Sequence, residues 1–352
     1  MKYHAVLRAG RGASVCPRGA IGLARSALER AVTGGLLISA LLAGSMAAVQ
    51  AQSDYPNRPV RLIVPYSAGG VADVGMRLLA EGLSANLKQQ FVVENRPGAG
   101  GIIAAKAGAS AAPDGYTLSM TGNNYSIAAA LFNALPYDIL RDFESVSTVS
   151  FFDLLLLTRE GSPLKSMQDV IAYAKANPGK LNIGTMVPGS TQNLAAELFR
   201  SSQKLDVAIV PFKTSPDMAT AVMRGDVDVA FEFYAASQGL LRDKKLMPLA
   251  STGTKRTAYL PDVPTAMETG VNDFEVSSWN SISVPVGTPR SVIDTLNKAI
   301  NAVVVKPNVQ TMAHKLGMEL RGSAPDAVDR RLKADIDKWS DLIDTVGIAK
   351  RN

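Results

Sequence analysis

Four short segments rich in glycine, serine and threonine carry the groups best suited to hold a ligand. Each lies between an apolar run and a helical pattern, at residues 66–73, 95–101, 188–192 and 211–216. Glycine lets the backbone approach a ligand and turn its N–H groups outward, and the free N–H groups of a first helical turn favour an anion. Hydroxyl donors in these turns are Ser67, Ser190, Thr191 and Thr214. Any one such turn can be a plain strand–helix connection, but four in two halves of the chain predict an anion site closed from both sides.

The chain is poor in the side chains that most enzymes use. Cys16 is the sole cysteine, and His4 and His314 are the only two histidines. Catalytic triads, zinc sites and most general-base schemes draw on these residue types. The turns also lack the P-loop order, and residues 98–101 match only part of the dinucleotide-binding G-x-G-x-x-G pattern. We therefore expect no catalytic residue, no metal site and no cofactor, with His314 on the surface.

The first 51 residues have the pattern of a secretory signal. Six basic residues stand against the single acid Glu29 in the first thirty positions, and an apolar run follows at residues 31–49. The run ends in small residues at Val49 and Ala51, which suits a signal peptidase. Glycine and serine dilute the run, so it falls short of the ~20 apolar residues of a membrane-spanning helix. We predict a signal peptide at residues 1–51, cleavage after Ala51 and a periplasmic protein.

Removal of this leader changes the charge of the protein. The full chain has 37 Lys and Arg against 31 Asp and Glu, and the leader holds six of the basic residues and one of the acidic ones. The mature part therefore carries 31 against 30, and its basic residues are scattered. A basic patch is the electrostatic requirement for binding nucleic acid. We expect no nucleic-acid partner.

The elements that must position the turns alternate between strand and helix. The first half predicts strands at 60–64, 91–94 and 117–121 and helices at 72–87 and 102–109; the second predicts helices at 167–176, 194–203 and 216–224 and strands at 181–184, 207–210 and 227–231. Alternation of this kind is typical of parallel sheets covered on both faces, an α/β fold. Ligands of such sheets bind beyond the carboxyl ends of the strands, where the four turns lie.

A series of short motifs gives the mature chain a resemblance to a known family. The motifs are Tyr55-Pro-x-Arg-Pro-Val60, Gly69-Gly-x-x-Asp73, Val93-Glu-Asn-Arg-Pro-Gly-Ala-Gly-Gly101, Ala112-Pro-Asp-Gly-Tyr-Thr-Leu118, Leu135-Pro-Tyr-Asp138, Asp142-Phe143, Val210-Pro-Phe-Lys213, Gly225-Asp-Val-Asp228, Leu260-Pro-Asp-Val-Pro-Thr265 and Pro285-x-Gly-Thr-Pro289. Over almost its whole mature length the chain resembles the Bug/TctC family, the periplasmic substrate receptors of tripartite tricarboxylate transporters.

The resemblance implies a fold, a function and partners. The expected fold is α/β of the periplasmic binding protein kind, with two doubly wound lobes around a ligand cleft. Lobe 1 would comprise residues 52–152 and 277–352, and lobe 2 residues 153–276. The receptor would be a monomer that captures a small carboxylate by lobe closure and delivers it to the membrane permease subunits of a tripartite transporter.

The resemblance also implies a set of ligand-binding residues from both lobes. The turn after the first strand contributes Tyr66, Ser67, Gly69, Gly70, Ala72 and Asp73. The loop after the strand at 117–121 contributes Asn123, Asn124 and Ser126. The facing lobe contributes Ser190, Thr191, Phe212, Lys213 and Thr214. Glu232, at the end of the strand at 227–231, joins the set as a candidate that could select an amine on the ligand.

Several of these side chains also have ordinary structural interpretations. Asp73 can cap the first helix by accepting a backbone hydrogen bond instead of contacting a ligand. Lys213 can pair with a second carboxylate or be solvated at a strand end, and Glu232 can be a solvated loop residue. Tyr66 and Phe212 can sandwich the body of a ligand or belong to the core.

The chain departs from the family pattern in ways that leave the specific acid open. Ala68, Asn193 and Thr214 stand where Pro, His and Gly are common, and residues 184–190 lack two of the usual glycines. Two other functions stay open beside transport. One is a periplasmic sensor that presents the carboxylate to a membrane signalling protein. The other, disfavoured by the scarcity of cysteine and histidine, is a hydrolase that uses Asp73 or Glu232.

Overall fold

Ten strands of the computed structural model, which describes residues 55–352, build one mixed sheet. The strands are β1 (Val60–Val64), β2 (Phe91–Asn95), β3 (Thr117–Gly122), β4 (Phe143–Arg159), β5 (Asn182–Met186), β6 (Ala208–Phe212), β7 (Val229–Phe233), β8 (Leu246–Ser251), β9 (Ser277–Pro285) and β10 (Glu319–Leu320). Their order is β2-β1-β3-β9-β4-β7-β5-β6, with β8 and β10 also paired to β4. Residues 56–352 form one compact unit. The predicted signal peptide and its cleavage site lie outside the described residues.

The helices connect and cover these strands. They are α2 (Val71–Leu87), the short 3-10 helix η1 (Ala99–Gly101), α3 (Ile102–Ala109), α4 (Asn123–Leu131), α5 (Met167–Ala176), α6 (Thr191–Ser202), α7 (Ser215–Arg224), α8 (Tyr234–Arg242), α9 (Arg290–Val304), α10 (Pro307–Lys315) and α11 (Pro325–Val346). The α/β class expected from the sequence is confirmed. The helix expected at 194–203 begins earlier, at Thr191, because the Ser190 side chain caps it by accepting from the Asn193 N–H.

Two parallel groups of strands are joined by antiparallel strands that the sequence did not reveal. β1 pairs in parallel with β2 and β3, and β5 pairs in parallel with β6 and β7. β4 and β9 are antiparallel to their neighbours, so the sheet is mixed rather than parallel throughout. Alternation failed to reveal β4 because nearly all of its 17 residues are buried, which removes the polar face that a strand pattern needs.

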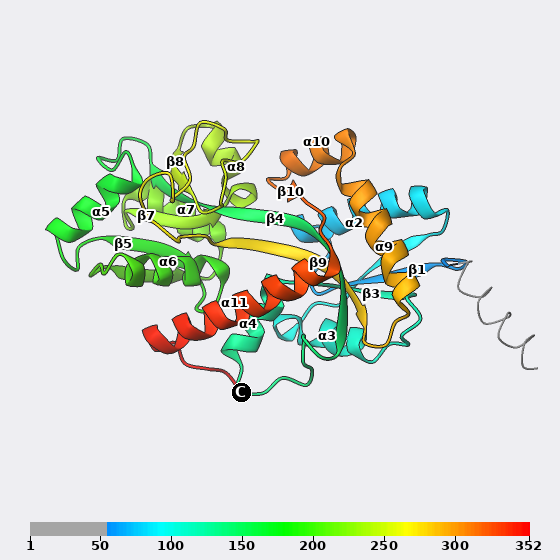
Figure 1. Ribbon diagram of the computed structural model, residues 1–352. Helices are drawn as coiled ribbons and strands as arrows, with labels where there is room; N and C mark the ends of the chain where they lie inside the picture. The colour runs from blue at the N-terminus through cyan, green and yellow to red at the C-terminus, as the bar shows by residue number, and fades with distance from the viewer. Residues whose placement is uncertain (1–54) are drawn as a thin grey trace, which may run out of the picture. The chain divides into compact units, whose positions relative to one another are not determined.

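The strand β4 changes partners halfway along its length. Residues from Phe143 to Asp153 pair with β9, whereas residues from Leu154 onward pair with β7 and β8. Figure 1 shows β4 and β9 crossing the middle, with β5, β7 and α5 to α8 on one side and β1, β3, α2 and α9 on the other. The two groups of strands are thus connected through a continuous sheet.

Helix α11 packs against hydrophobic clusters on both sides of this crossing. Near its start, Val328 and Leu332 join a cluster with Trp279 of β9. Near its end, Trp339 and Ile343 join the large cluster built from β4, β5, β7 and α6. The segment after residue 277 therefore contributes to the packing of both groups of strands.

A buried carboxyl lies at the point where β4 changes partners. Asp153 is 6% exposed and accepts a hydrogen bond from the hydroxyl of Ser277, the first residue of β9. Burial raises the pKa of Asp153 to about 6, against the lowering effect of the Ser277 hydrogen bond. The charge of Glu319 raises this pKa further and that of Arg321 lowers it.

We predict that the substitution Asp153→Asn changes the pH dependence of stability. A carboxyl whose folded pKa lies above its unfolded value stabilises the fold in full only below the unfolded value, about 3.9, and this contribution is lost as the pH rises through about 6. Because asparagine cannot ionise, the free energy of unfolding of the variant should gain on the wild type by roughly 2 kcal/mol between about pH 4 and pH 7.5. Urea titrations at both pH values measure this gain.

Asp169 provides a control of opposite sign. It is partly exposed, and hydrogen bonds from the Lys165 N–H and from Ser166 lower its pKa. Its contribution is present at neutral pH and lost as the pH falls, so Asp169→Asn should destabilise the protein at neutral pH and have little effect in acid. If the free energy of unfolding changed equally with pH in the wild type and in Asp153→Asn, the role given to Asp153 would be contradicted.

Candidate ligand-binding site

A cavity of about 390 Å³ opens between the start of α2 and the start of α8. Its walls come from the β1–α2 turn, the crossing strands β4 and β9, the starts of α6 and α7, and the end of β7. The lining residues are Tyr66, Val71, Ala72, Phe152, Gln192, Ser215, Glu232, Phe233, Ala235, Ala236, Ser278, Asn280 and Gly317. The cavity thus lies at the crossing of the sheet, where several strand–helix turns meet.

The start of α2 presents backbone N–H groups at this cavity. The helix begins after Gly70, and no side chain caps it. The first N–H groups of a helix have no partner within the helix, and Val71 and Ala72 line the cavity. Gly69 enters the turn with a φ of +88°, a conformation that other residues adopt rarely. This wall offers hydrogen-bond donors and the positive end of a helix dipole, which favour a negatively charged group.

Asp73 holds the turn in this shape from behind. Its side chain is 1% exposed and accepts from the Gly69 N–H at 2.8 Å, from Arg77 Nε at 3.0 Å and from Asn95 Nδ2 at 2.7 Å. Asn95 also donates to the carbonyl oxygen of Tyr66 at 2.9 Å. Burial acts to raise the pKa of Asp73, but the three hydrogen bonds and the Arg77 charge outweigh it and hold the pKa below its usual value. Asp73 is therefore ionised. It does not line the cavity. Its hydrogen bonds to Gly69 and Asn95 instead hold the turn against β2.

Tyr66 brings a hydroxyl donor to the same wall. Its surface is 38% exposed, yet the surrounding protein raises the pKa of its phenol to about 12 by desolvation. The hydroxyl therefore stays protonated at neutral pH and can donate a hydrogen bond.

The start of α4, which follows β3 directly, meets the start of α6 beside the cavity. The loop expected after the strand at 117–121 is instead the first turn of this helix. Asn123 Nδ2 donates to the Thr191 hydroxyl at 3.1 Å, and Trp339 Nε1 of α11 donates to Asn123 Oδ1 at 3.3 Å. The sequence expected Asn123 and Thr191 in facing walls, and the structure brings them into direct contact. The hydroxyl of Ser126 is buried without a hydrogen-bond partner among the described residues. The half-buried Asn124 lies close to Gly101.

The turn before α7 lies farther from the cavity than its sequence suggested. Thr214 caps α7 by accepting from the Asp217 N–H and donates to the Asp217 carboxylate at 2.7 Å. Phe212 packs against the hydrophobic cluster beneath α7, and Lys213 is exposed. Ser215, the next residue, does line the cavity.

The cavity takes three residues from the predicted set and several that the sequence did not suggest. Tyr66, Ala72 and Glu232 line it. The remaining predicted residues do not line it and lie in nearby turns, strand ends and first helical turns: Ser67, Gly69, Gly70, Asp73, Asn123, Asn124, Ser126, Ser190, Thr191, Phe212, Lys213 and Thr214. Among the lining residues that were missed, Phe152 of β4 and Ser278 and Asn280 of β9 belong to strands that the sequence did not predict, whereas Val71, Gln192 and Ser215 directly follow predicted residues or turns. Phe152 and Ser278 are direct register partners in the crossing.

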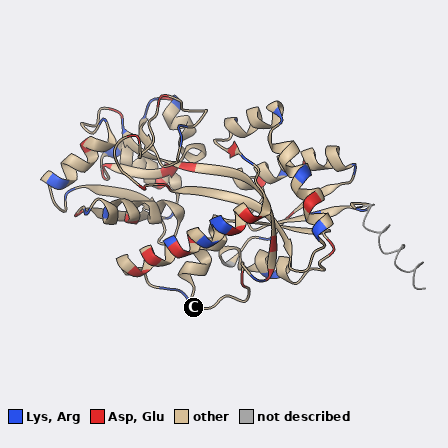
Figure 2. Cartoon of the chain, viewed as in Figure 1, with Lys and Arg blue, Asp and Glu red and all other residues tan. Residues whose placement is uncertain are grey.

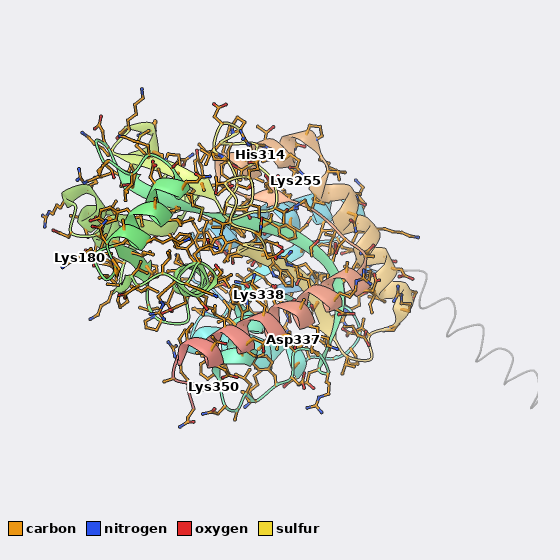
Figure 3. All side chains as sticks on the ribbon, turned by 60° about the vertical axis from the view of Figure 1, so that its left-hand side comes forward. Lys180, Lys255, His314, Asp337, Lys338 and Lys350 are labelled. Atoms are coloured by element: carbon orange, nitrogen blue, oxygen red, sulfur yellow. The ribbon has the colours of Figure 1, made fainter. Side chains whose placement is uncertain are left out.

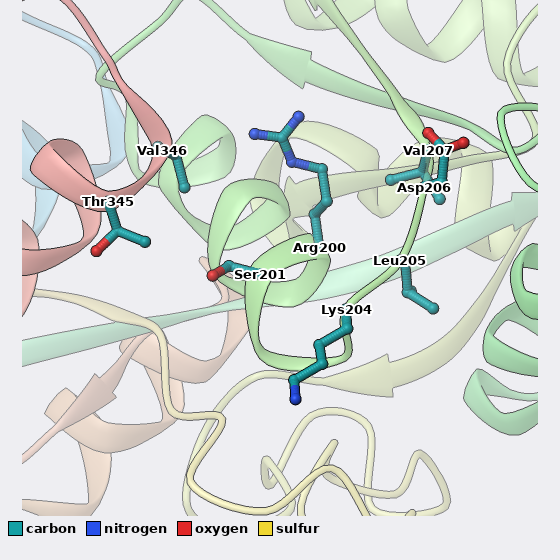
Figure 4. A pocket seen from close by; sticks show the side chains of 8 residues that line it. All are labelled: Arg200, Ser201, Lys204, Leu205, Asp206, Val207, Thr345 and Val346. Carbon is teal, nitrogen blue, oxygen red and sulfur yellow. The ribbon is translucent and has the colours of Figure 1, made fainter.

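Other features of the described chain lie apart from the predicted site, and a larger hollow of about 520 Å³, lined by residues such as Asn133 and Tyr137, contains none of the predicted residues. Residues 55–352 contain no cluster of His, Cys, Asp or Glu able to hold a metal ion. His314 lies on α10 (Figure 3), and it is not among the residues that line the cavity. A second hollow of about 390 Å³, between the ends of α6 and α11, is lined by Arg200, Lys204 and neighbouring residues, none of which belongs to the predicted site (Figure 4). Arg200 is already paired with Glu197 at 2.6 Å.

Charged residues of both signs are mixed over the surface, and length and hydropathy decide whether a helix can span a membrane. Figure 2 shows Lys and Arg interspersed with Asp and Glu, most clearly along α11, where Arg330 pairs with Asp326. Across the described part of the chain, none of the helices combines the length and the apolar character needed to cross a membrane.

Comparison with known proteins identifies the class. The family model described as "tripartite tricarboxylate transporter family receptor" matches residues 75–348. Protein BugT of Bordetella pertussis is 33% identical over 307 residues, which cover 87% of this chain and 94% of BugT. The structure of R. palustris Rpa4515 with adipate has 33% identity and a TM-score of 0.71, over 84% of this chain and 100% of that one. MatC from Rhodopseudomonas palustris with bound malate has 30% identity and a TM-score of 0.66, over 82% and 100%.

The protein is therefore a solute receptor with the periplasmic binding protein fold. It belongs to the tripartite tricarboxylate transporter receptor family, also known as Bug/TctC. The function of the family is transport and not catalysis, which confirms the preference for a receptor over an enzyme.

We predict that Asp73→Asn destabilises the protein. The change removes the charge that accepts three hydrogen bonds and leaves an amide whose NH₂ group faces donors, so the free energy of unfolding should fall by roughly 1–3 kcal/mol. Chemical denaturation measures the loss. Asp326→Asn is the matched control, because Asp326 also pairs with an arginine four residues on but lies exposed on α11. Equal effects of the two substitutions would contradict the role given to Asp73.

Proposed function

We propose that this chain is an exported receptor that captures a small carboxylate in the cavity between α2 and α8 and passes it to the membrane permease of a tripartite transporter. The observation that carries the proposal is the uncapped start of α2 at the cavity wall. Its free N–H groups and dipole favour a carboxylate, and the Tyr66 hydroxyl supplies a further donor.

The relatives support a carboxylate as the ligand. The structures of Rpa4515 and MatC contain adipate and malate, and each covers more than four fifths of this chain at 30% identity or above. Both ligands are small organic acids, and the cavity volume of about 390 Å³ lies in the usual range for a small-molecule site.

Capture by lobe closure follows from how the strands cross. We assign residues 52–152 and 277–352 to lobe 1 and residues 153–276 to lobe 2, with β4 and β9 as the connections between them. The change of partners in β4 at Asp153 and the start of β9 at Ser277 support these boundaries. A few residues at such crossings absorb the backbone rotation of a hinge, and ligand shifts the population toward the closed form.

Export and partners complete the proposal. The basic and apolar pattern of residues 1–51 supports a cleaved signal peptide and a periplasmic location. The receptor then acts as a monomer, with the permease subunits of the transporter as its partner in the membrane, in keeping with its family.

We predict that a small organic acid raises the melting temperature of the purified mature protein. A ligand at about a hundred times its Kd stabilises the folded state by about 2.7 kcal/mol, which corresponds to a shift of several degrees. Ala236→Trp should abolish the shift because Ala236 lines the cavity at the start of α8. Ala85→Trp, on an exposed face of α2, is the matched control and should keep it. The proposal fails if no aliphatic or aromatic acid gives a shift, or if Ala236→Trp responds as the wild type does.

A further inference from the structure

The walls of the cavity contain one ionisable acid and no basic side chain. Among the residues that line it, only Tyr66 and Glu232 can ionise, and none is Lys, Arg or His. Since the Tyr66 phenol remains neutral, Glu232 is the sole charge that the side chains bring to the cavity. This is an unusual arrangement for a site whose opposite wall favours an anion.

Glu232 is buried and only half satisfied. It is 4% exposed, and its Oε1 accepts from Gln192 Nε2 at 3.0 Å and from the Phe233 N–H at 2.7 Å. Its Oε2 is shielded from solvent and has no hydrogen-bond partner among the described residues. The described residues also give Glu232 no ion pair within 4.0 Å, since each salt bridge in residues 55–352 joins other groups. Leaving a charged oxygen buried without a donor costs more than the 1–3 kcal/mol of a neutral group.

The hydrogen-bonded neighbour of Glu232 supplies no cation. Gln192 donates one of its two amide N–H groups to Glu232 Oε1 and is itself neutral. The end of the cavity formed by Glu232 and Gln192 therefore has no positive charge to balance the carboxylate.

A small internal void beside Glu232 cannot supply the positive charge that this carboxylate lacks. Glu232 also borders a space of about 10 Å³, lined mainly by apolar residues such as Met218 and Val222. A space of that size holds at most about one water molecule. Such a water can donate a hydrogen bond to Oε2, but it cannot neutralise the carboxylate.

We propose that the ligand is a carboxylate that also carries a protonated amine, with the amine held at Glu232 and the carboxylate at the start of α2. This inference rests on the proposed function and specifies its substrate class. An ammonium group supplies both the hydrogen bond and the positive charge that the Glu232 end lacks. A second carboxylate placed there would meet a like charge, which raises its binding free energy.

Calorimetric titration of the mature protein with matched acids tests the proposal. Caproate, ε-hydroxycaproate, ε-aminocaproate and adipate share one chain length and differ at the far end, and succinate and aspartate differ by a single amine. We expect at least one amino acid to bind more tightly than its counterpart without the amine by about tenfold or more, with ε-hydroxycaproate no tighter than caproate by that margin.

The substitution Glu232→Gln keeps the size of the side chain and removes its charge. In this variant the preference for the amine should fall about tenfold, while the affinity for adipate or succinate stays the same or rises. Glu197→Gln is the control, because Glu197 lies on α6, pairs with Arg200 and does not line the cavity. It should retain the full preference. Circular dichroism and the melting temperature check that both variants fold.

Two results would overturn the proposal. One is tighter binding of adipate and succinate than of their amino counterparts by the wild type. The other is an unchanged preference in Glu232→Gln, which would mean that the internal water satisfies Oε2. A wild type that binds none of these acids would instead count against the proposed function itself.

Discussion

The site depends on one buried carboxylate that never touches the cavity. Asp73 gathers the Gly69 N–H, the Arg77 guanidinium and the Asn95 amide around a side chain that is 1% exposed. Asn95 lies at the end of β2, so these bonds fix the turn after β1 to the neighbouring strand. With the turn fixed, α2 starts at Val71 with N–H groups that no side chain caps, and Val71 and Ala72 line the cavity. The donors on that wall are organised before any ligand arrives, which lowers the cost of ordering them on binding.

The crossing strands set a second constraint, because they belong to the sheet and to the cavity at once. β4 and β9 carry Phe152, Ser278 and Asn280 into the cavity wall while their backbones join the two parallel groups of strands. Helix α11 spans the same crossing, where its first turns pack with Trp279 of β9 in one cluster and its own Trp339 lies in another. A rotation of one group against the other would therefore act on the cavity directly, since the same residues form the wall and the connection.

The sequence predicted the local elements better than the residues that line the site. The strand at 60–64 and the helices at 102–109 and 167–176 were predicted correctly, because each has a local pattern of apolar or capping residues. β4 and β9 lack such a signal: both are buried almost throughout, so no alternation marks them. Because the sequence did not predict these two strands, it also did not predict the cavity residues Phe152, Ser278 and Asn280. Asp73 shows the other limit, since its side chain points into a network with Asn95 that no local pattern reveals.

One wall of the cavity offers main-chain donors and the other offers side chains, and this difference affects how such a receptor can change during evolution. The donors at the start of α2 are main-chain atoms, and most substitutions leave a main-chain N–H in place. The opposite wall consists of side chains, with Glu232 as the sole charged one. Under the proposed mode of binding, a gene duplicate can therefore change its ligand preference through substitutions at Glu232 or Gln192 while the main-chain donors at the start of α2 stay in place.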